Sequence, residues 1–178
     1  MAIEEQFYLF WPPVVLLWSR KRWPILPLAA TLVIASFAAN AWLVRTDPVS
    51  TFYLPLTRMW ELLLGAVLAA VVERTGMASE TRAHGLSLAG LALLAAGLGV
   101  ISERSVFPGF VALLPTLAAA AFTAAGPDGV FNRYVLASRP MVGIGLISYP
   151  LYLWHWPLLS FLQIAEAGAP TKIGRAHV

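Results

Sequence analysis

Long apolar stretches separated by short polar ones dominate the chain. A helix needs about 20 mostly apolar residues to cross the hydrocarbon core of a bilayer, with a range of about 17–25. Six stretches approach this length, and charged residues, Pro or Gly bound them. They predict an all-α fold, a polytopic transmembrane helix bundle of about six spans, at residues 3–19, 24–44, 55–72, 85–101, 108–125 and 141–165.

Two of these stretches are rich in small residues. Gly and Ala are dense in 85–101 and 108–125. Small residues let helix backbones approach closely in lipid, so these two spans are expected to be closely packed. The polar residues 73–84, which include His84, predict a loop on the cytoplasmic side without a chemical role.

Composition supports lipid rather than water as the solvent. The chain is 59% hydrophobic and 12% charged, with a mean hydropathy of +0.74, whereas soluble domains are about 25% charged. No cysteine is present, which excludes disulfides, thiolate nucleophiles and Cys-ligated zinc. No pair of histidines has the spacing of metal ligands either, so no metal site is expected.

The basic residues indicate membrane orientation rather than nucleic-acid binding. They give a net charge of +3 but are scattered among short loops. Cytoplasmic loops carry the excess of Lys and Arg. This rule predicts that the first, third and fifth loops are cytoplasmic, because they hold Arg20, Lys21, Arg22, Arg74, Arg82, Arg133 and Arg139 against Arg45 and Arg104 in the other two.

The first candidate site opens the chain. Glu4 and Glu5 enter the first span, followed by Tyr8 and by Pro12 and Pro13. Proline donates no backbone hydrogen bond, so two carbonyls lose their helical partners and a kinked, locally polar helix is expected beside two acids. The alternative is an interfacial cap, because acids favour a helix N-terminus and Tyr favours the membrane boundary.

The second candidate site is Arg58 with Glu61. These residues are three apart, so they share a helix face and can pair. Ionisable residues inside a span are costly and mark functional sites. The alternative is a structural ion pair near the outer interface.

The third candidate site lies in the last span. Ser148, Tyr152 and His155 fall on one helical face, with Tyr149 beside them. A neutral His can act as a general base, and Tyr can donate a hydrogen bond to developing charge. The alternative is an aromatic girdle with one histidine at the headgroups.

Three stretches in this order resemble the acyltransferase 3 family of membrane O-acyltransferases, the O-antigen O-acetylase type. They are AIEEQFYLFWP at 2–12, RMWELLLGAVLA at 58–69 and ISYPLYLWHWPL at 147–158. The resemblance implies a multi-pass enzyme of the bacterial inner (cytoplasmic) membrane. It moves an acyl group, usually acetyl, from acetyl-CoA or another acyl-CoA to a hydroxyl of a cell-envelope or exported carbohydrate such as lipopolysaccharide. Membrane lipid, acyl-CoA and the carbohydrate acceptor are the implied partners, with no bound cofactor.

The resemblance also assigns roles. It implies catalytic roles for Glu5, Arg58, Glu61 and His155, and substrate-binding roles for Glu4, Tyr8, Tyr149 and Tyr152. Family members carry further helices before the first matching stretch, including the principal catalytic histidine, and one more helix at the end. This polypeptide alone is therefore expected to be inactive. Residues 172–178 match the translation of a sequencing adapter, so the acyltransferase segment is taken as 1–171.

Two other functions use the same features. A transporter or flippase for a lipid-linked sugar or small solute would use the charged residues as a polar pathway. A membrane scaffold would use them for stability alone.

Overall fold

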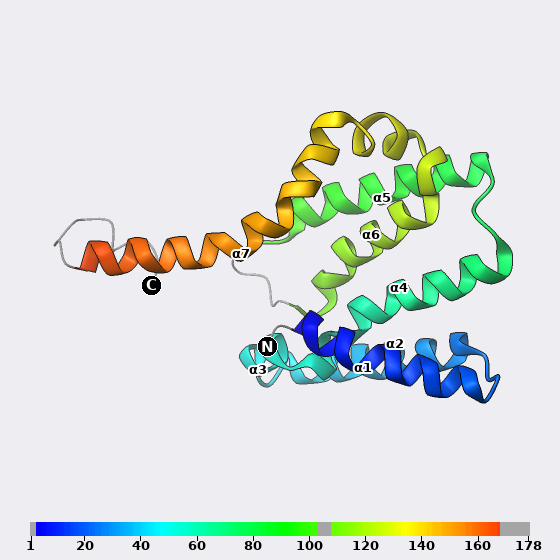
Figure 1. The fold of residues 1–178 in the computed structure, drawn as a ribbon, viewed down its shortest axis with the longest axis horizontal. Helices are drawn as coiled ribbons and strands as arrows, with labels where there is room; N and C mark the ends of the chain where they lie inside the picture. Colours follow the sequence, from blue (N-terminus) through cyan, green and yellow to red (C-terminus); the bar gives the residue numbers. More distant parts are fainter. Residues whose placement is uncertain (1–2, 103–107, 168–178) are drawn as a thin grey trace. The chain divides into compact units, whose positions relative to one another are not determined.

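The computed structural model describes residues 3–102 and 108–167 (Figure 1). These described residues form helices and no strand, which confirms the all-α prediction. The chain divides into two compact units, Met1–Arg133 and Tyr134–Val178. The expected adapter-derived segment, 172–178, lies outside the described residues.

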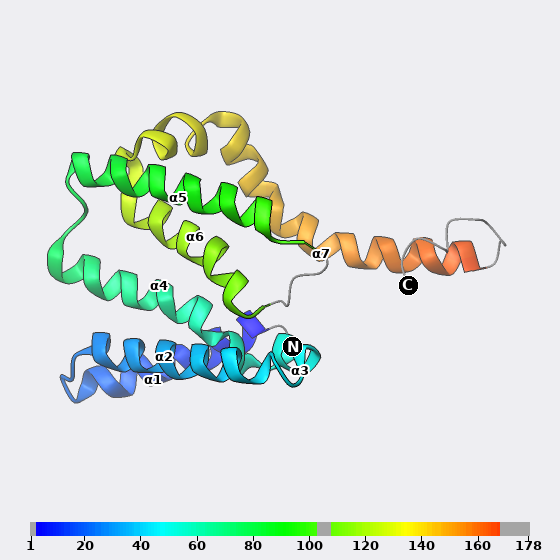
Figure 2. The ribbon, with the colours of Figure 1, turned by 180° about the vertical axis from the view of Figure 1, so that it is seen from behind.

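Within the described residues, the first unit contains six α-helices (Figures 1 and 2). A 3-10 turn, Phe110–Ala112, leads into the last of them, and another, Gly126–Asp128, follows it. The helices are α1 (Ile3–Arg20), α2 (Ile25–Leu43), α3 (Pro48–Tyr53), α4 (Pro55–Thr75), α5 (Glu80–Val100) and α6 (Leu113–Ala125).

Four segments are long and apolar enough to cross a membrane within the part of the chain that the structure describes. They are Ile25–Leu43, Pro55–Thr75, Glu80–Val100 and Phe110–Asp128. Each coincides with a predicted span. The first and last predicted spans also form helices, α1 and α7 (Arg139–Ala167), but their crossing of the membrane stays a prediction.

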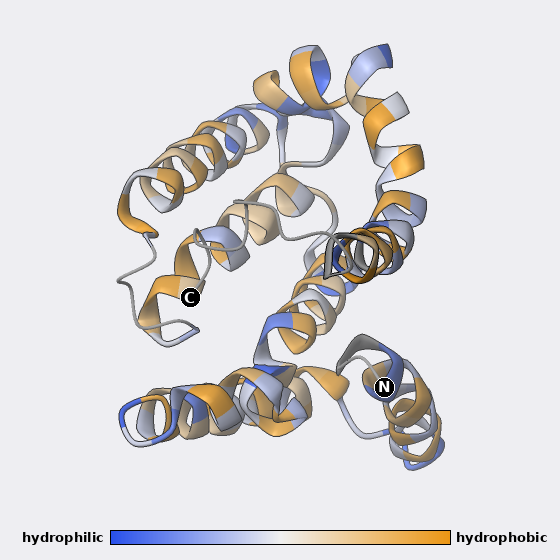
Figure 3. Cartoon of the chain, turned by 90° about the vertical axis from the view of Figure 1, so that its left-hand side faces the viewer, coloured by the Kyte–Doolittle hydropathy of each residue, from blue (hydrophilic) through white to orange (hydrophobic). Residues whose placement is uncertain are grey.

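The outward faces of the helices are apolar. Hydrophobic colour surrounds most helices, and hydrophilic colour gathers near turns (Figure 3). Trp42 is 73% exposed and Leu98 78% exposed. A water-soluble helix would carry a single apolar stripe with a polar opposite face. Exposed apolar side chains on this scale indicate that lipid solvates the helices.

The helices pack in two main pairs, α2 with α4 and α5 with α6. The second pair confirms the prediction that the two small-residue spans are closely packed. Ala83, Ser87, Gly90 and Gly97 of α5 are buried, and Gly90 and Gly97 face residues of α6. A Cβ at Gly90 would lie 3.0 Å from the Phe122 ring, a tight contact, so glycine favours the close approach of the two helices there.

Two loops are shorter than the sequence predicts. α4 continues to Thr75 and α5 already begins at Glu80, so the expected loop at 73–84 is wrong at both ends and His84 lies in a helix. Good helix formers such as Glu, Arg and Ala extend a helix beyond its apolar stretch. Between α2 and α4, the short helix α3 begins at Pro48, because Asp47 accepts a hydrogen bond from the Ser50 N–H and proline suits the first helical position.

The second unit is mainly α7, a single helix of 29 residues. Pro150 and Pro157 lie inside it without ending it. Likewise, α1 runs uninterrupted through Pro12 and Pro13. Each proline removes one backbone donor, so carbonyls one turn earlier lose their usual partner in both helices.

Candidate functional site

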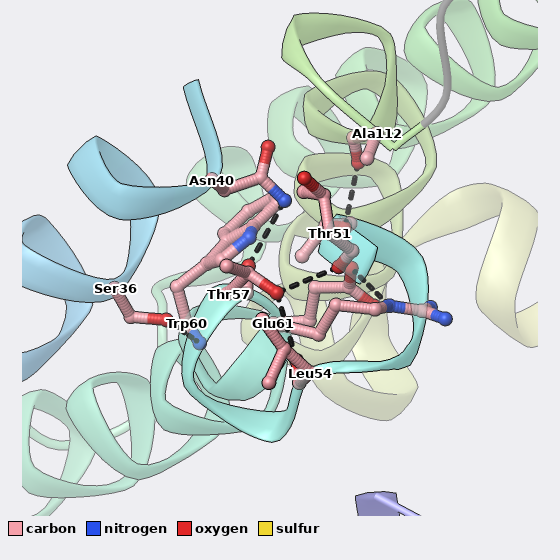
Figure 4. A network of polar contacts seen from close by, with 10 residues as sticks. Ser36, Asn40, Thr51, Leu54, Thr57, Trp60, Glu61 and Ala112 are labelled. Atoms are coloured by element: carbon pink, nitrogen blue, oxygen red, sulfur yellow. Dashed lines mark hydrogen bonds and ion pairs between the residues drawn. The ribbon is translucent and has the colours of Figure 1, made fainter. Parts of the chain in front are cut away.

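A corner between α3 and α4 carries a network of buried polar groups (Figure 4). The Thr57 hydroxyl lies 2.6 Å from the Thr51 carbonyl and 2.7 Å from the Leu54 carbonyl, and donates its proton between them. The Thr51 hydroxyl donates to the Asp47 carbonyl at 2.6 Å. Carbonyls at a helix C-terminus lack intrahelical partners, so Thr57 satisfies the end of α3 and fixes the turn into α4.

Ser36 of α2 joins this network to the first turn of α4. Its hydroxyl donates to the Leu56 carbonyl at 2.5 Å and accepts from the Trp60 N–H at 3.1 Å. These two backbone groups are four residues apart and would ordinarily bond to each other within the helix. The hydroxyl therefore bridges a backbone hydrogen bond of α4 from a neighbouring helix.

Asn40 lies one turn further along α2. Its Nδ2 donates to the Thr57 carbonyl at 2.9 Å. Its Oδ1 and the Trp60 Nε1 are both buried without a hydrogen-bond partner in the described part of the chain. The Trp60 ring packs edge-to-face on Phe37 at 5.0 Å, and Phe37 packs on Phe110 at 5.5 Å. An unpaired donor and an unpaired acceptor thus lie in the same buried corner.

Arg58 and Glu61 form the predicted ion pair beside this corner. The Arg58 Nε donates to Glu61 Oε1 at 3.1 Å, and its Nη2 donates to Oε2 at 3.0 Å. Each side chain is 23% exposed. The guanidinium also lies 5.0 Å from the centre of the Phe52 ring. A bidentate pair on a partly buried helix face holds the guanidinium in one orientation.

The ion pair does not use all the hydrogen-bond donors of Arg58. A guanidinium has five N–H donors, and two of them serve Glu61. The remaining donors can hydrogen-bond a carbonyl or an anionic oxygen, and the charge of Glu61 keeps the site close to neutral until such a group arrives. Fixed donors of this kind can stabilise negative charge that develops on a bound oxygen.

The residues predicted near the start of the chain lie on α1, which packs against α4. Glu5 and Tyr8 are exposed, and Tyr8 is 69% exposed. Glu4 belongs to the same helix, but its side chain lies outside the described residues. Phe7 is buried and stacks on Trp11 at 5.6 Å, so the packed face of α1 is aromatic.

The residues predicted in the last span lie on α7 in the second unit. His155 Nδ1 is 2.6 Å from the Tyr152 carbonyl, and the two rings are 5.7 Å apart. A carbonyl only accepts, so this contact requires a proton on Nδ1 and leaves Nε2 of the neutral ring as an acceptor. Tyr149 and Tyr152 are exposed within this unit. The contact therefore fixes the orientation of the imidazole ring on α7.

Of the eight predicted site residues, the structure joins Arg58 to Glu61 through their side chains and His155 to the Tyr152 carbonyl. Sequence reasoning missed Ser36, Asn40, Thr51, Thr57 and Trp60. A usable signal existed for the first two. Ser36 and Asn40 are four residues apart in an otherwise apolar stretch, so they share a helix face, and polar residues at such positions are expected to bond to a neighbouring helix.

A second buried polar cluster contrasts with this corner. Asn132 Nδ2 donates to the carbonyls of Phe122 and Gly126, both at 2.7 Å. The Ser87 hydroxyl donates to Asn132 Oδ1 at 3.2 Å and accepts from the Phe131 N–H at 3.0 Å. These side-chain groups all have hydrogen-bond partners inside the protein, as expected of polar groups that hold α5 to the end of α6.

Comparison with known proteins finds several bacterial relatives. The chain is 30% identical to the peptidoglycan O-acetyltransferase OatA of Listeria monocytogenes over 90% of its own length and 28% of that protein. It is 28% identical to the putative peptidoglycan O-acetyltransferase YrhL of Bacillus subtilis, over 96% of the chain and 29% of the relative. It is 27% identical to the O-acetyltransferase OatA of Staphylococcus aureus, over 92% of the chain and 29% of that protein.

The chain thus spans less than a third of the length of these curated relatives. No solved structure matches it. The family model described as an acyltransferase domain matches residues 1–167, which include all three stretches that carry the resemblance. This chain, with its membrane-helix fold and its matching stretches in order, belongs to the acyltransferase 3 family.

Proposed function

We propose that this chain is part of a membrane O-acetyltransferase that transfers an acetyl group to a hydroxyl of a cell-wall glycan. The observation that carries the proposal is the bidentate Arg58–Glu61 pair beside a buried polar corner, in a chain of the acyltransferase 3 family. The family supports the reaction class, and the pair supplies a charged donor in the first turns of a helix that is apolar from Leu62 to Val72.

The acceptor follows from the relatives. Two of them are named as peptidoglycan O-acetyltransferases, one as putative. Those names give no support to lipopolysaccharide, which the resemblance to O-antigen O-acetylases had suggested. A hydroxyl of the glycan strand in peptidoglycan is therefore the acceptor we propose.

The proposed donor is acetyl-CoA. The acceptor hydroxyl oxygen attacks the thioester carbonyl, a C–O bond forms, the C–S bond breaks, and the hydroxyl proton passes to a base while the thiolate leaves and is protonated. In this scheme Arg58 donates to the oxygen that gains negative charge, and Glu61 orients Arg58. His155 Nε2 accepts or relays a proton, and the exposed Glu5, Tyr8, Tyr149 and Tyr152, with Glu4, contact substrates.

The proposed location is the bacterial cytoplasmic membrane. Loop charges put the end of the unit that carries α3 and the start of α4 on the outer side. That orientation supports access of the polar corner to an extracytoplasmic glycan.

A segment exchange tests the proposal. Residues 3–167 replace the matching segment of Listeria OatA in a strain that lacks its own copy, and the O-acetyl content of the peptidoglycan is measured. We expect acetylation well above the empty-vector strain. A hybrid that reaches the membrane in the amount of native OatA yet adds no acetyl groups would contradict acyl transfer. Solute uptake by the same strain, without acetylation, would favour a transporter. The same strain producing the chain without the rest of OatA is expected to show no acetylation, because the chain alone is expected to be inactive.

A further inference from the structure

A cleft of about 560 Å³ opens at the end of the first unit opposite to α3. It lies between the C-terminal ends of α1 and α4 and the start of α2, which both views place at the same end (Figures 1 and 2). Its lining includes Trp18, Ser19, Trp23, Ala70, Glu73 and Arg74. None of these residues belongs to the polar corner around Arg58.

Hydrogen bonds and a contact between two tryptophan rings hold the turn between α1 and α2 at the rim of this cleft. The Lys21 N–H donates to the Trp18 carbonyl at 3.1 Å, and the Trp18 Nε1 donates to the Pro24 carbonyl at 3.1 Å. The Trp18 and Trp23 rings meet edge-to-face at 4.8 Å. Residues on both sides of Arg20–Arg22 line the cleft, so the turn that carries these three cations borders it.

The lining of the cleft holds one cation and one acid, Arg74 and Glu73, and the turn beside it carries Arg20, Lys21 and Arg22. Cations therefore outnumber acids in the cleft and the adjacent turn taken together. Tryptophans are enriched at the membrane–water boundary, and basic pockets between membrane helices bind anionic lipid headgroups. We propose that this cleft binds the headgroup phosphate of an anionic phospholipid. The proposal does not depend on the acetyl-transfer function.

The geometry favours a lipid over a nucleotide. A base needs an open aromatic face for stacking, but Lys21 Nζ lies 4.9 Å from the centre of the Trp23 ring and covers one face. The rings of Trp18 and Trp23 meet edge to face, so they do not form two parallel surfaces between which a base could stack. A compact phosphate beside cations requires no such face.

Lipid binding by the purified chain tests the proposal. The chain in neutral detergent is titrated with phosphatidylglycerol or phosphatidylcholine, and bound lipid is counted by native mass spectrometry. We expect phosphatidylglycerol to bind and to raise Tm, and phosphatidylcholine to do neither. Arg74→Gln is expected to weaken phosphatidylglycerol binding about fivefold, since one cation near the surface is removed. Arg74→Lys is expected to retain it.

Arg45→Gln is the matched control, because Arg45 follows the opposite end of α2. Equal affinity for both lipids, or an equal loss with Arg45→Gln, would overturn the proposal. Displacement of the lipid by equimolar inorganic phosphate or adenosine 3′,5′-bisphosphate would do so too, in favour of a free phosphate or a nucleotide. If Arg74→Gln fails to fold, the salt dependence of lipid binding by the unchanged chain tests the proposal instead. Phosphatidylglycerol binding is expected to weaken as salt is added, and binding that does not change with salt would overturn the proposal.

Discussion

Single hydroxyls and amides position the helices of the first unit. Ser36 and Asn40 reach from α2 to backbone groups of α4, and Thr57 ties α4 to the end of α3. In lipid, such interhelical bonds replace the hydrophobic contrast that holds a soluble core together. The position of Arg58 and Glu61 at the start of α4 therefore depends on polar residues that carry no charge.

Replacing Ser36 tests this dependence. Ser36→Ala removes the bridge between α2 and the first turn of α4, and we expect it to lower the free energy of unfolding in detergent by about 0.5–1.5 kcal/mol. Thr31→Val on the same helix is the control, because the Thr31 hydroxyl bonds only within α2, to the Pro27 carbonyl. Equal effects of the two changes on Tm would show that the bridge contributes nothing specific.

Asp47 gives α3 a dependence on pH. Hydrogen bonds from Ser50 hold the pKa of the Asp47 carboxyl below its ordinary value. Its stabilisation of α3 is therefore complete above the ordinary pKa of Asp, about 3.9, and is lost as pH falls through the lowered value. Hydrogen exchange of the α3 amides measured from pH 6 downward, corrected for intrinsic rates, should show this loss.

Asp47→Asn supplies the comparison for that experiment. Asn caps a helix as well as Asp does but does not titrate in this range. We expect the variant to keep α3 protected with no pH step. A step of the same size in the variant would assign the pH dependence to another group.

At the scale of elements, backbone proximity decides the packing of α5 on α6. Gly90 faces the Phe122 ring and the Ala118 carbonyl, and an added Cβ would lie 3.0 and 3.2 Å from them. Gly65 in α4, by contrast, has open space around its missing Cβ. Close packing therefore explains the glycine at position 90 but not the glycine at position 65.

The pair Gly90→Ala and Gly65→Ala tests that difference. Gly90→Ala is expected to cost about 1–3 kcal/mol, because the methyl group overpacks the helix contact. Gly65→Ala is expected to be neutral or stabilising by up to about 1 kcal/mol, since alanine favours a helix and meets nothing. Thermal unfolding of both variants in one detergent measures the contrast, and a stable Gly90→Ala would refute the close approach.

Most helices could be predicted because apolar length alone determines them. The small residues of 85–101 and 108–125 also predicted which spans pack closely. The helix ends at Thr75 and Glu80 could not be predicted from hydropathy, since polar helix formers continue a helix into water. Hydropathy missed α3 too, although Asp47, Pro48 and Ser50 form a capping sequence that could have revealed it.

Of the candidate site, the spacing of Arg58 and Glu61 was sufficient to predict their pairing, because residues three apart share a helix face. The contacts of Ser36 and Asn40 with α4 depend on which helices pack together, and one sequence does not contain that information.

At the scale of the molecule, the exposed apolar helices and the uneven loop charges together predict orientation. The chain contains no cysteine, so single introduced thiols report topology without background. Thr46→Cys, between α2 and α3, should react with an impermeant maleimide on intact cells. Ala78→Cys, between α4 and α5, should react only after permeabilisation. The reverse pattern would put the polar corner on the cytoplasmic side.

We propose that Glu61 and Arg58 serve acetyl transfer rather than folding alone. The most direct measurement is the O-acetyl content of peptidoglycan from the segment-exchange strain carrying Glu61→Gln, which keeps the shape of the side chain and removes its charge. At equal membrane abundance and equal Tm, we predict at least a tenfold loss of acetylation relative to the unchanged hybrid. Unchanged acetylation at that abundance would show that the charge of Glu61 has no part in acetyl transfer.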